Sequence, residues 1–391
     1  MALAVGSAAV VFFILVFTPS PSPTTADSIF RCYNSIVSFG DSLADTGNIL
    51  VPSLQRSPCV AVNPPYGRTF FHRPTGRYSD GRLVIDFIAQ SMGLPLLKPY
   101  VPEANADAAQ RRRSFSTGVN FAVSGASALS YEFYEKIGCQ NPLTNASLGT
   151  QLKWFRTFLA GLPDSRRYLE RSLVVMGEIG GNDYNHLLLQ GRTLDELQIL
   201  VPMVVSYIGS TIQELIELGV VTMLVPGNLP IGCLPVCLTR YEKSSTAKDY
   251  DRHGCLISLN EFAEYHNHLL LQELQRIREL YPHVNIMYAD YYNAAMRMYQ
   301  SPKQFGFGNR ILSSCCGGGG VYNFNESARC GVPQATCCDD PSKYISWDGM
   351  HLTEAAYRLI AQAVIQGTYT NPPFSNICLG SISKTRGISD Y

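Results

Sequence analysis

The chain has 391 residues, and its 31 lysines and arginines balance its 31 aspartates and glutamates. This balance gives no electrostatic argument for a nucleic-acid partner. Hydrophobic residues make up 46% of the chain, which is enough for a large core, and the 12 cysteines are typical of a protein that folds in an oxidising compartment.

The first predicted element is a secretory signal peptide. No charged side chain precedes Asp27, and an apolar stretch runs from about Ala8 to Phe17 before Pro, Ser and Thr take over. This stretch is too short to span a bilayer comfortably, and the small residues after it are typical of a cleavage site near Ala26. We therefore predict that residues 1–26 are removed, that the protein is secreted, and that the mature chain has no transmembrane segment.

After the leader, apolar segments alternate with segments of helical periodicity. The apolar and β-branched runs that predict strands lie at 35–39, 118–129, 172–183, 220–227 and 284–290. The segments that predict helices lie at 83–93, 148–162, 194–219, 259–282 and 352–367. Pro202 is expected to kink or break the third of these helices. The alternation predicts an α/β fold, in which helices cover both faces of a parallel sheet.

The pattern is consistent with one domain over residues 27–391. A division near residue 140 would separate motifs that we expect to act together. The Cys- and Gly-rich stretch at about 313–342 is predicted to be a disulfide-pinned insertion before the last helix. Its cysteines lack the Cys-x-x-Cys pair or neighbouring His typical of zinc sites. They are therefore expected to form disulfides, in a pairing that stays open, and they are Cys315, Cys316, Cys330, Cys337 and Cys338.

Polar residues stand where the predicted strands end, and they could supply the parts of a hydrolytic site. Ser42 lies in FGDSLADTGN after the first strand, and Gly125 and Asn182 follow later strands. Asp348 and His351 precede the last helix. Ester hydrolysis needs a nucleophile, a base, a group that orients the base, and donors to the oxyanion. Ser42, His351 and Asp348 can fill the first three roles, and the amides of Ser42, Gly125 and Asn182 the last.

Each of these blocks also has a purely structural explanation. Asp41, Ser42, Asp45 and Asn48 are good helix-capping or turn residues. Asp41 is expected to shape the turn, and Asp45 and Asn48 to support it by hydrogen bonding. The aromatic loop at 65–78 could line a pocket or simply pack.

In combination, the blocks resemble the plant GDSL esterase/lipases of the SGNH hydrolase superfamily. The similar blocks, in the family's order, are FGDSLADTGN, GRYSDGRLVIDFIAQSMGLPLL, GVNFAVSGASAL, GEIGGNDYN, VPGNLPIGCLP, NIMYADYYNAAM and WDGMHLTEAAYRLIA. The resemblance implies a three-layer, flavodoxin-like α/β/α sandwich with a five-stranded parallel sheet. It implies a triad of Ser42, Asp348 and His351, and an oxyanion hole of Ser42 N, Gly125 N and the Asn182 side chain. Ser124 stands where many members have a second glycine, and Cys337 is additional.

The leading hypothesis is a secreted carboxylic ester hydrolase that forms an acyl-enzyme and requires no metal or organic cofactor. An acyltransferase with the same residues stays open, and a non-catalytic wall- or lipid-binding relative is disfavoured because all five site residues are present. The resemblance admits small-molecule, lipid and cell-wall polysaccharide esters as substrates, in the apoplast or cell wall. Two sequons predict N-glycosylation of surface loops at Asn145 and Asn325.

Overall fold

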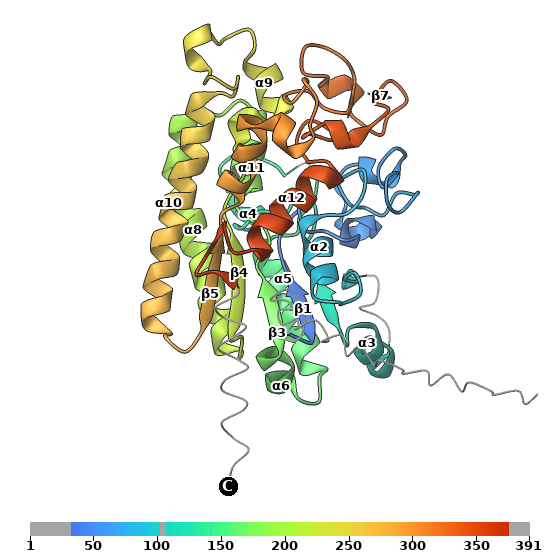
Figure 1. Ribbon diagram of the computed structural model, residues 1–391. Coiled ribbons are helices and arrows are strands. Elements are labelled where there is room, and N and C mark those ends of the chain that lie inside the picture. The colour runs from blue at the N-terminus through green and yellow to red at the C-terminus, as the bar shows by residue number, and fades with distance from the viewer. Residues whose placement is uncertain (1–32, 102–106, 142, 375–391) are drawn as a thin grey trace, which may run out of the picture.

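The computed structural model describes residues 33–101, 107–141 and 143–374, so the predicted signal peptide lies outside it. In this part of the chain, a six-stranded sheet lies between layers of helices (Figure 1). Its strand order is β2-β1-β3-β4-β5-β8. The strands are β1 (Ser35–Ser38), β2 (Gly118–Asn120), β3 (Ser172–Val175), β4 (Thr222–Pro226), β5 (Asn285–Ala289) and β8 (Thr370–Asn371). The first five are parallel, as predicted, and β8 adds a short antiparallel edge to β5.

The helices include all those that the sequence predicts. The α-helices are α2 (Val84–Ser91), α3 (Ala108–Ser114), α4 (Tyr131–Lys136), α5 (Leu148–Ala160), α6 (Ser165–Glu170), α7 (Gly181–Leu189), α8 (Leu194–Glu217), α9 (Pro235–Tyr241), α10 (Ile257–Leu280), α11 (Tyr291–Gln300) and α12 (Glu354–Ile365). Those that the sequence did not predict, such as α4, α6 and α9, are mostly too short to show an amphipathic period. A small hairpin of β6 (Cys316–Gly317) and β7 (Thr336–Cys337) lies within the predicted insertion.

Helix α8 is unbroken at Pro202, so of the kink or break expected there, the break is excluded. Within the described residues, it is also the one helix long and apolar enough to cross a membrane by length and composition. Half of that apolar window is buried inside the fold, and α8 packs along the length of α10 (Figure 1). Its apolar face therefore has a partner within the protein.

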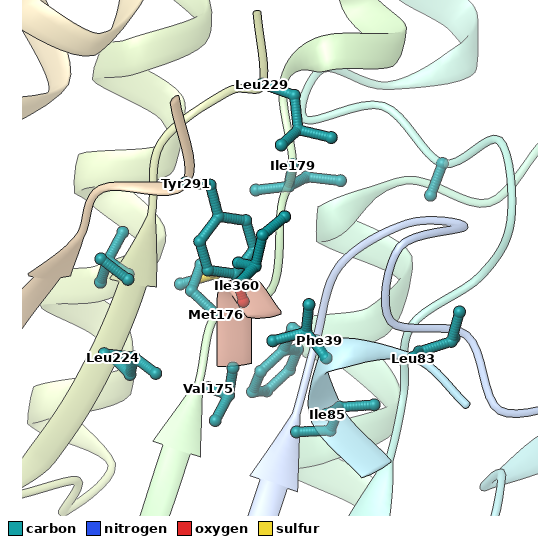
Figure 2. Packing of buried hydrophobic residues seen from close by; sticks show 14 of the residues in the cluster. Phe39, Leu83, Ile85, Val175, Met176, Ile179, Leu224, Leu229, Tyr291 and Ile360 are labelled. Carbon is teal, nitrogen blue, oxygen red and sulfur yellow. The ribbon is translucent and has the colours of Figure 1, made fainter. Parts of the chain in front are cut away.

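Part of the core lies between the sheet and helices α11 and α12. Phe39 follows β1, Val175 ends β3 and Leu224 lies within β4. Tyr291 and Ile360 pack over them from the helices (Figure 2). All five side chains are buried. Strands covered on both faces read as continuous apolar runs, which is why the sequence pattern predicted them. This packing supports the loops that follow the strands.

Hydrogen bonding continues past the assigned ends of the strands and joins the loops that follow them. Phe121 N donates to Ser38 O at 2.7 Å, and Asp41 N donates to Glu178 O at 3.1 Å. Gly40 has φ +125°, and a Cβ there would lie 3.0 Å from Glu178 O. Glycine at this position allows the Ser42 loop and the loop after β3 to approach closely.

A buried ion pair anchors the loop that follows Ser42. Arg77 makes two hydrogen bonds of 2.8 Å to the carboxylate of Asp86 in α2, and it also donates to Thr46 O at 3.1 Å. Only 6% of the Arg77 side chain is exposed, and the Asp86 side chain is fully buried. The pair therefore ties α2 to the polypeptide just after the nucleophile loop.

The Asp86→Ala substitution should lower the free energy of unfolding by about 3 to 5 kcal/mol, because it leaves the Arg77 guanidinium buried without its counter-charge. Urea unfolding measures this change. The matched control is Glu170→Ala, which breaks the solvent-exposed Arg166–Glu170 pair of α6 and should change the midpoint little. Equal losses in the two variants would contradict the anchoring role.

Candidate active site

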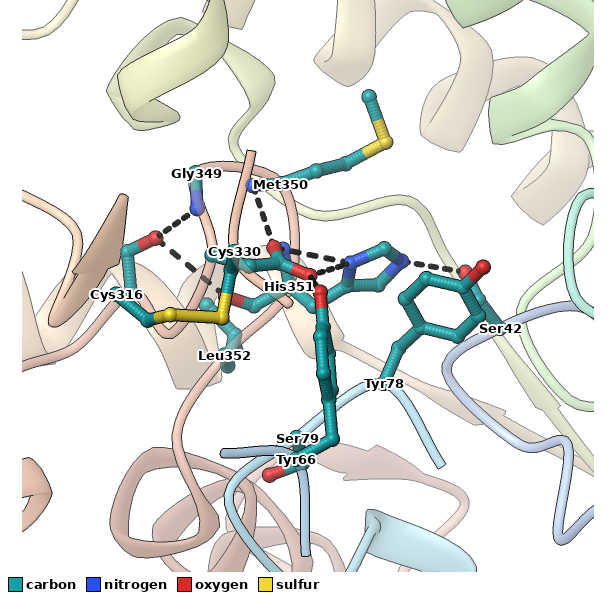
Figure 3. A network of polar contacts seen from close by, with 12 residues as sticks. Ser42, Tyr66, Tyr78, Ser79, Cys316, Cys330, Gly349, Met350, His351 and Leu352 are labelled. Atoms are coloured by element: carbon teal, nitrogen blue, oxygen red, sulfur yellow. Dashed lines mark hydrogen bonds and ion pairs between the residues drawn. A yellow bond between two sulfur atoms is a disulfide. The ribbon is translucent and has the colours of Figure 1, made fainter. Parts of the chain in front are cut away.

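Ser42, His351 and Asp348 form one chain of hydrogen bonds (Figure 3). His351 Nε2 lies 2.8 Å from Ser42 Oγ, although the two residues are 309 positions apart. His351 Nδ1 lies 2.8 Å from Asp348 Oδ2 and 3.0 Å from Oδ1. All three residues are buried. The turn after β1 and the turn before α12 thus place a hydroxyl, an imidazole and a carboxylate in line.

The turn before α12 is folded around the Asp348 carboxylate. Asp348 Oδ1 accepts hydrogen bonds from Met350 N at 3.0 Å and His351 N at 2.8 Å. Trp347 N donates to His351 O at 2.7 Å and closes the turn. Burial acts to raise the pKa of Asp348, but the charge of His351 and these hydrogen bonds lower that pKa to about 2. The carboxylate is therefore ionised wherever the imidazole can act as a base.

The aromatic loop at 65–78 contacts two members of this chain, Asp348 and His351. Tyr66 Oη donates to Asp348 Oδ2 at 2.8 Å. The Tyr78 ring lies against the imidazole of His351, with ring centroids 4.5 Å apart (Figure 3). Both tyrosines also line the cavity next to His351. The loop therefore both packs and lines a pocket, so the two roles considered from the sequence are combined.

The Cys-rich insertion is attached to the strand-like segment that leads into Asp348. Cys315 N donates to Ser346 O at 3.0 Å, and Cys316 N donates to Trp347 O at 2.7 Å. Disulfides link Cys315 to Cys338 and Cys316 to Cys330, and a third links Cys233 to Cys255 elsewhere in the fold. Cys337, which we had also assigned to disulfides, is a free thiol 3.8 Å from the Cys315 sulfur. The insertion thus braces the Asp348 turn.

Two backbone N–H groups that the sequence assigned to the oxyanion hole have no acceptor within the described part of the protein. Among the residues that the structure describes, neither Ser42 N nor Gly125 N donates a hydrogen bond. Gly125 has φ +82°, and its carbonyl accepts from Asn141 Nδ2 at 2.7 Å and His186 Nε2 at 3.1 Å. These two side chains hold the Gly125 loop through its carbonyl oxygen and do not engage the Gly125 N–H group.

The side-chain amide of Asn182, which the sequence assigned to the oxyanion hole, already donates hydrogen bonds within the protein. The sequence GGND reads as a turn, but Gly181 already begins α7, and Asn182 lies in the first turn of that helix. Its Nδ2 donates to Asp41 Oδ2 at 2.6 Å and to Ala126 O at 3.1 Å. The amide is therefore oriented by two acceptors at the edge of the Ser42 site.

Asp41 and Glu178 form a buried acid pair behind Asn182. Burial and the neighbouring Glu178 carboxyl raise the pKa of Asp41 well above its usual range, and burial also raises the pKa of Glu178. Two carboxyl groups in hydrogen-bond contact cannot both ionise readily, so the pair gives up its second proton only at a higher pH than an exposed carboxyl would. Glu178 also accepts from Gly181 N at 3.0 Å. The sequence assigned Asp41 to the turn, which its contact with Leu43 N bears out, but gave no signal for Glu178.

Two further buried carboxylates join the loops around the site. Asp45 accepts from Asn48 N at 2.7 Å in its own loop and from Ser124 N at 2.8 Å next to Gly125. Asp183 accepts from Ala128 N at 2.7 Å and from Tyr134 Oη at 2.5 Å. The sequence predicted support from Asp45, whereas it gave no reason to select Asp183. Both carboxylates therefore hold neighbouring loops in register through backbone N–H groups.

Two buried histidines outside the triad are neutral. Burial lowers the pKa of His186 to about 4 and that of His266 to about 3. His266 Nδ1 lies 2.8 Å from Tyr184 Oη, within the core beneath α7. Their hydrogen bonds position α7 and the Gly125 loop, so both residues have structural roles.

Two cavities border the triad. The larger has a volume of about 360 Å³ and is lined by Asp348, His351, Asn182 and the two tyrosines of the aromatic loop, among others. The smaller, of about 40 Å³, is lined by Ser42 and by His351 and Asn182 as well. The reactive atoms therefore lie between two spaces of very different size.

Comparison with known proteins gives a consistent result. The family model described as GDSL-like Lipase/Acylhydrolase matches residues 36–364. The chain is similar to three Arabidopsis thaliana proteins, GDSL esterase/lipase At1g28590, At1g28580 and At1g31550. The first is 51% identical over 92% of this chain and 89% of its own length, the second 48% over 97% and 96%, and the third 50% over 94% and 92%.

The Asp183→Asn variant tests how a buried carboxyl group makes the free energy of unfolding depend on pH. Burial raises the pKa of Asp183 to about 6, whereas an unfolded aspartate ionises near pH 4. As the pH rises from about 4 to 6, the unfolded state therefore releases this proton first, and the wild type loses about 3 kcal/mol of unfolding free energy through this group. Urea titrations across this range should show that loss in the wild type and in an exposed-site control, Asp195→Asn, but not in Asp183→Asn. Parallel curves for all three proteins would contradict the assignment.

Proposed function

This chain belongs to the GDSL-like lipase/acylhydrolase family and is a carboxylic ester hydrolase, and we propose that it cleaves esters through an acyl-enzyme formed on Ser42. The observation that carries this proposal is the 2.8 Å contact between Ser42 Oγ and His351 Nε2. A hydroxyl paired with an imidazole, which is itself oriented by a carboxylate, is the arrangement that activates a serine nucleophile.

In the first step, His351 acts as the general base. Its Nδ1–H donates to Asp348, which leaves Nε2 unprotonated and able to accept the Ser42 proton. As Ser42 Oγ attacks the ester carbonyl carbon, the imidazole becomes positively charged. The ionised Asp348 carboxylate stabilises that charge at a distance of 2.8 Å.

The negative charge that develops on the carbonyl oxygen is stabilised by amides. Ser42 N and Gly125 N supply two donors without giving up existing hydrogen bonds. Asn182 Nδ2 supplies the third by sharing a hydrogen that it otherwise directs to Asp41 or Ala126. The two backbone donors are fixed in advance, and they are effective because they need no reorganisation when the charge appears.

The intermediate collapses when His351 gives its proton to the leaving alcohol. The acyl group then remains bound to Ser42 as an ester. Water enters, His351 takes one of its protons, and the resulting hydroxide attacks the acyl carbon. Ser42 recovers its proton from His351, and the carboxylic acid leaves.

The cellular setting is part of the proposal. We propose that residues 1–26 are cleaved, that residues 27–391 form one hydrolase domain including the insertion at about 313–342, and that it acts in the apoplast or cell wall. The three disulfides among the described residues support an oxidising compartment. Asn145 and Asn325 are both exposed, as glycosylated asparagines must be.

The Ser42→Ala variant should lose more than about 10⁴-fold in kcat on 4-nitrophenyl acetate, because no other group replaces the nucleophile. Its circular dichroism spectrum and thermal midpoint should match those of the wild type. The control variant, Ser91→Ala, removes a partly buried hydroxyl of α2 and should retain activity. Wild-type turnover in Ser42→Ala would remove Ser42 from the mechanism.

The Asn182→Ala variant should lower kcat by about a hundredfold or more and change KM less, because an oxyanion donor acts chiefly in the transition state and is worth about 3 kcal/mol. Steady-state kinetics on the same substrate measures both constants. The control is Asn293→Ala, an exposed asparagine in α11. A raised KM with unchanged kcat would instead assign Asn182 to substrate binding.

A further inference from the structure

The two cavities beside the triad differ in which reacting residues they border. Four residues line both cavities, so the two cavities are neighbours at the site. These residues are Asn182, Asn185, Met350 and His351. Ser42 lines the smaller cavity but not the larger one. This difference indicates which cavity holds the acyl half of an ester and which holds the alcohol half, provided that Ser42 is the nucleophile as proposed above.

The geometry of attack limits where each half of the ester can lie. The acyl carbon becomes bonded to Ser42 Oγ, so the acyl chain must extend into space that Ser42 borders. The alcohol oxygen must lie within hydrogen-bond reach of His351 Nε2, because it leaves with that proton. The carbonyl oxygen is directed toward the amide donors. From these constraints, we propose that the smaller cavity receives the acyl group and the larger cavity the alcohol, so that the substrates are short-chain acyl esters of bulky, amphipathic alcohols.

The smaller cavity is much the more restricted of the two. Its volume of about 40 Å³ is about one ninth of the 360 Å³ of the larger cavity. Its apolar wall is formed by Leu229, Ile231 and Leu234, which are buried residues. Such a space accommodates an acetyl methyl group most readily, and an octanoyl chain would have to extend beyond it.

The apolar wall of the smaller cavity is held in place by the segment between β4 and α9. The Cys233–Cys255 disulfide lies next to Leu234, and Gly232 N donates to Asn260 Oδ1 at 2.9 Å. A wall pinned on both sides of its chain cannot easily move aside for a longer acyl group. The size limit is therefore built into the fold.

The larger cavity has the dimensions and chemistry of a small-molecule site. Its volume of about 360 Å³ falls within the range of such sites. Tyr66, Tyr78 and Phe324 contribute aromatic walls, and Glu326 and Arg329 contribute charged groups. An alcohol with an apolar or aromatic body and polar substituents matches this combination.

The experiment compares the acetate, butanoate and octanoate of 4-nitrophenol, which changes the acyl group alone. For the wild type, kcat/KM should fall by at least about tenfold from acetate to octanoate, because each poorly accommodated methylene costs binding. Leu234→Ala enlarges the smaller cavity and should raise kcat/KM for octanoate by at least about tenfold relative to acetate. Leu229→Ala provides an independent enlargement if the first variant does not fold.

The matched control is Val236→Ala, which enlarges the larger cavity. It should preserve the acyl-length ranking and change the relative rates of ethyl and aryl acetates. Preference of the wild type for octanoate, or a change of acyl ranking in Val236→Ala but not in Leu234→Ala or Leu229→Ala, would overturn the assignment. The mechanism and the cavity assignment can fail separately. If Ser42→Ala retains activity, the proposed mechanism is wrong. If activity depends on Ser42 but the wild type prefers octanoate, only the cavity assignment is wrong.

Discussion

Buried carboxylates that must find hydrogen-bond donors hold this site together. A carboxylate removed from water is stable only if N–H or O–H groups surround it. Asp45 meets this need with amides from two loops, and Asp183 joins α7 to the segment after Gly125. Asp348 folds its own turn around its oxygens. Each carboxylate therefore fixes a loop that carries a functional group. The ends of the strands support these loops from below.

The same carboxylates differ in charge because they face different partners. Asp348 faces His351, and its pKa falls to about 2. The hydrogen-bond donors to Asp183 in the described part of the chain are uncharged, and burial, with a smaller contribution from the Glu178 carboxyl, raises its pKa to about 6. Burial and the Glu178 carboxyl raise the pKa of Asp41, which accepts from Asn182 Nδ2. A negative charge thus lies beside the imidazole that becomes cationic, whereas an acid pair that resists ionisation lies behind the amide proposed to receive the oxyanion. This separation suits a reaction in which positive and negative charges develop on opposite sides of Ser42.

The parts of this arrangement that are local in sequence could be predicted, and the parts that depend on distant contacts could not. The strand pattern located Ser42 at a strand end, and the spacing of Asp348 and His351 suggested that one could orient the other. No local pattern reveals that Glu178 reaches Asp41, or that Asn182 Nδ2 donates to Ala126 O, because those contacts form only when loops from different strands meet. Disulfide pairing is hidden for the same reason, and Cys337 proved to be the unpaired thiol of the insertion. The β8 edge is too short to show a pattern.

The proposed mechanism requires that the fold activates Ser42 alone as a nucleophile. A fluorophosphonate ester reacts covalently with activated serines, and peptide mass spectrometry locates the adduct. We expect one adduct per chain, on the peptide that contains Ser42, together with loss of hydrolysis in proportion to labelling and little labelling of His351→Ala. An adduct on another residue, or full hydrolysis after complete labelling of Ser42, would contradict this mechanism.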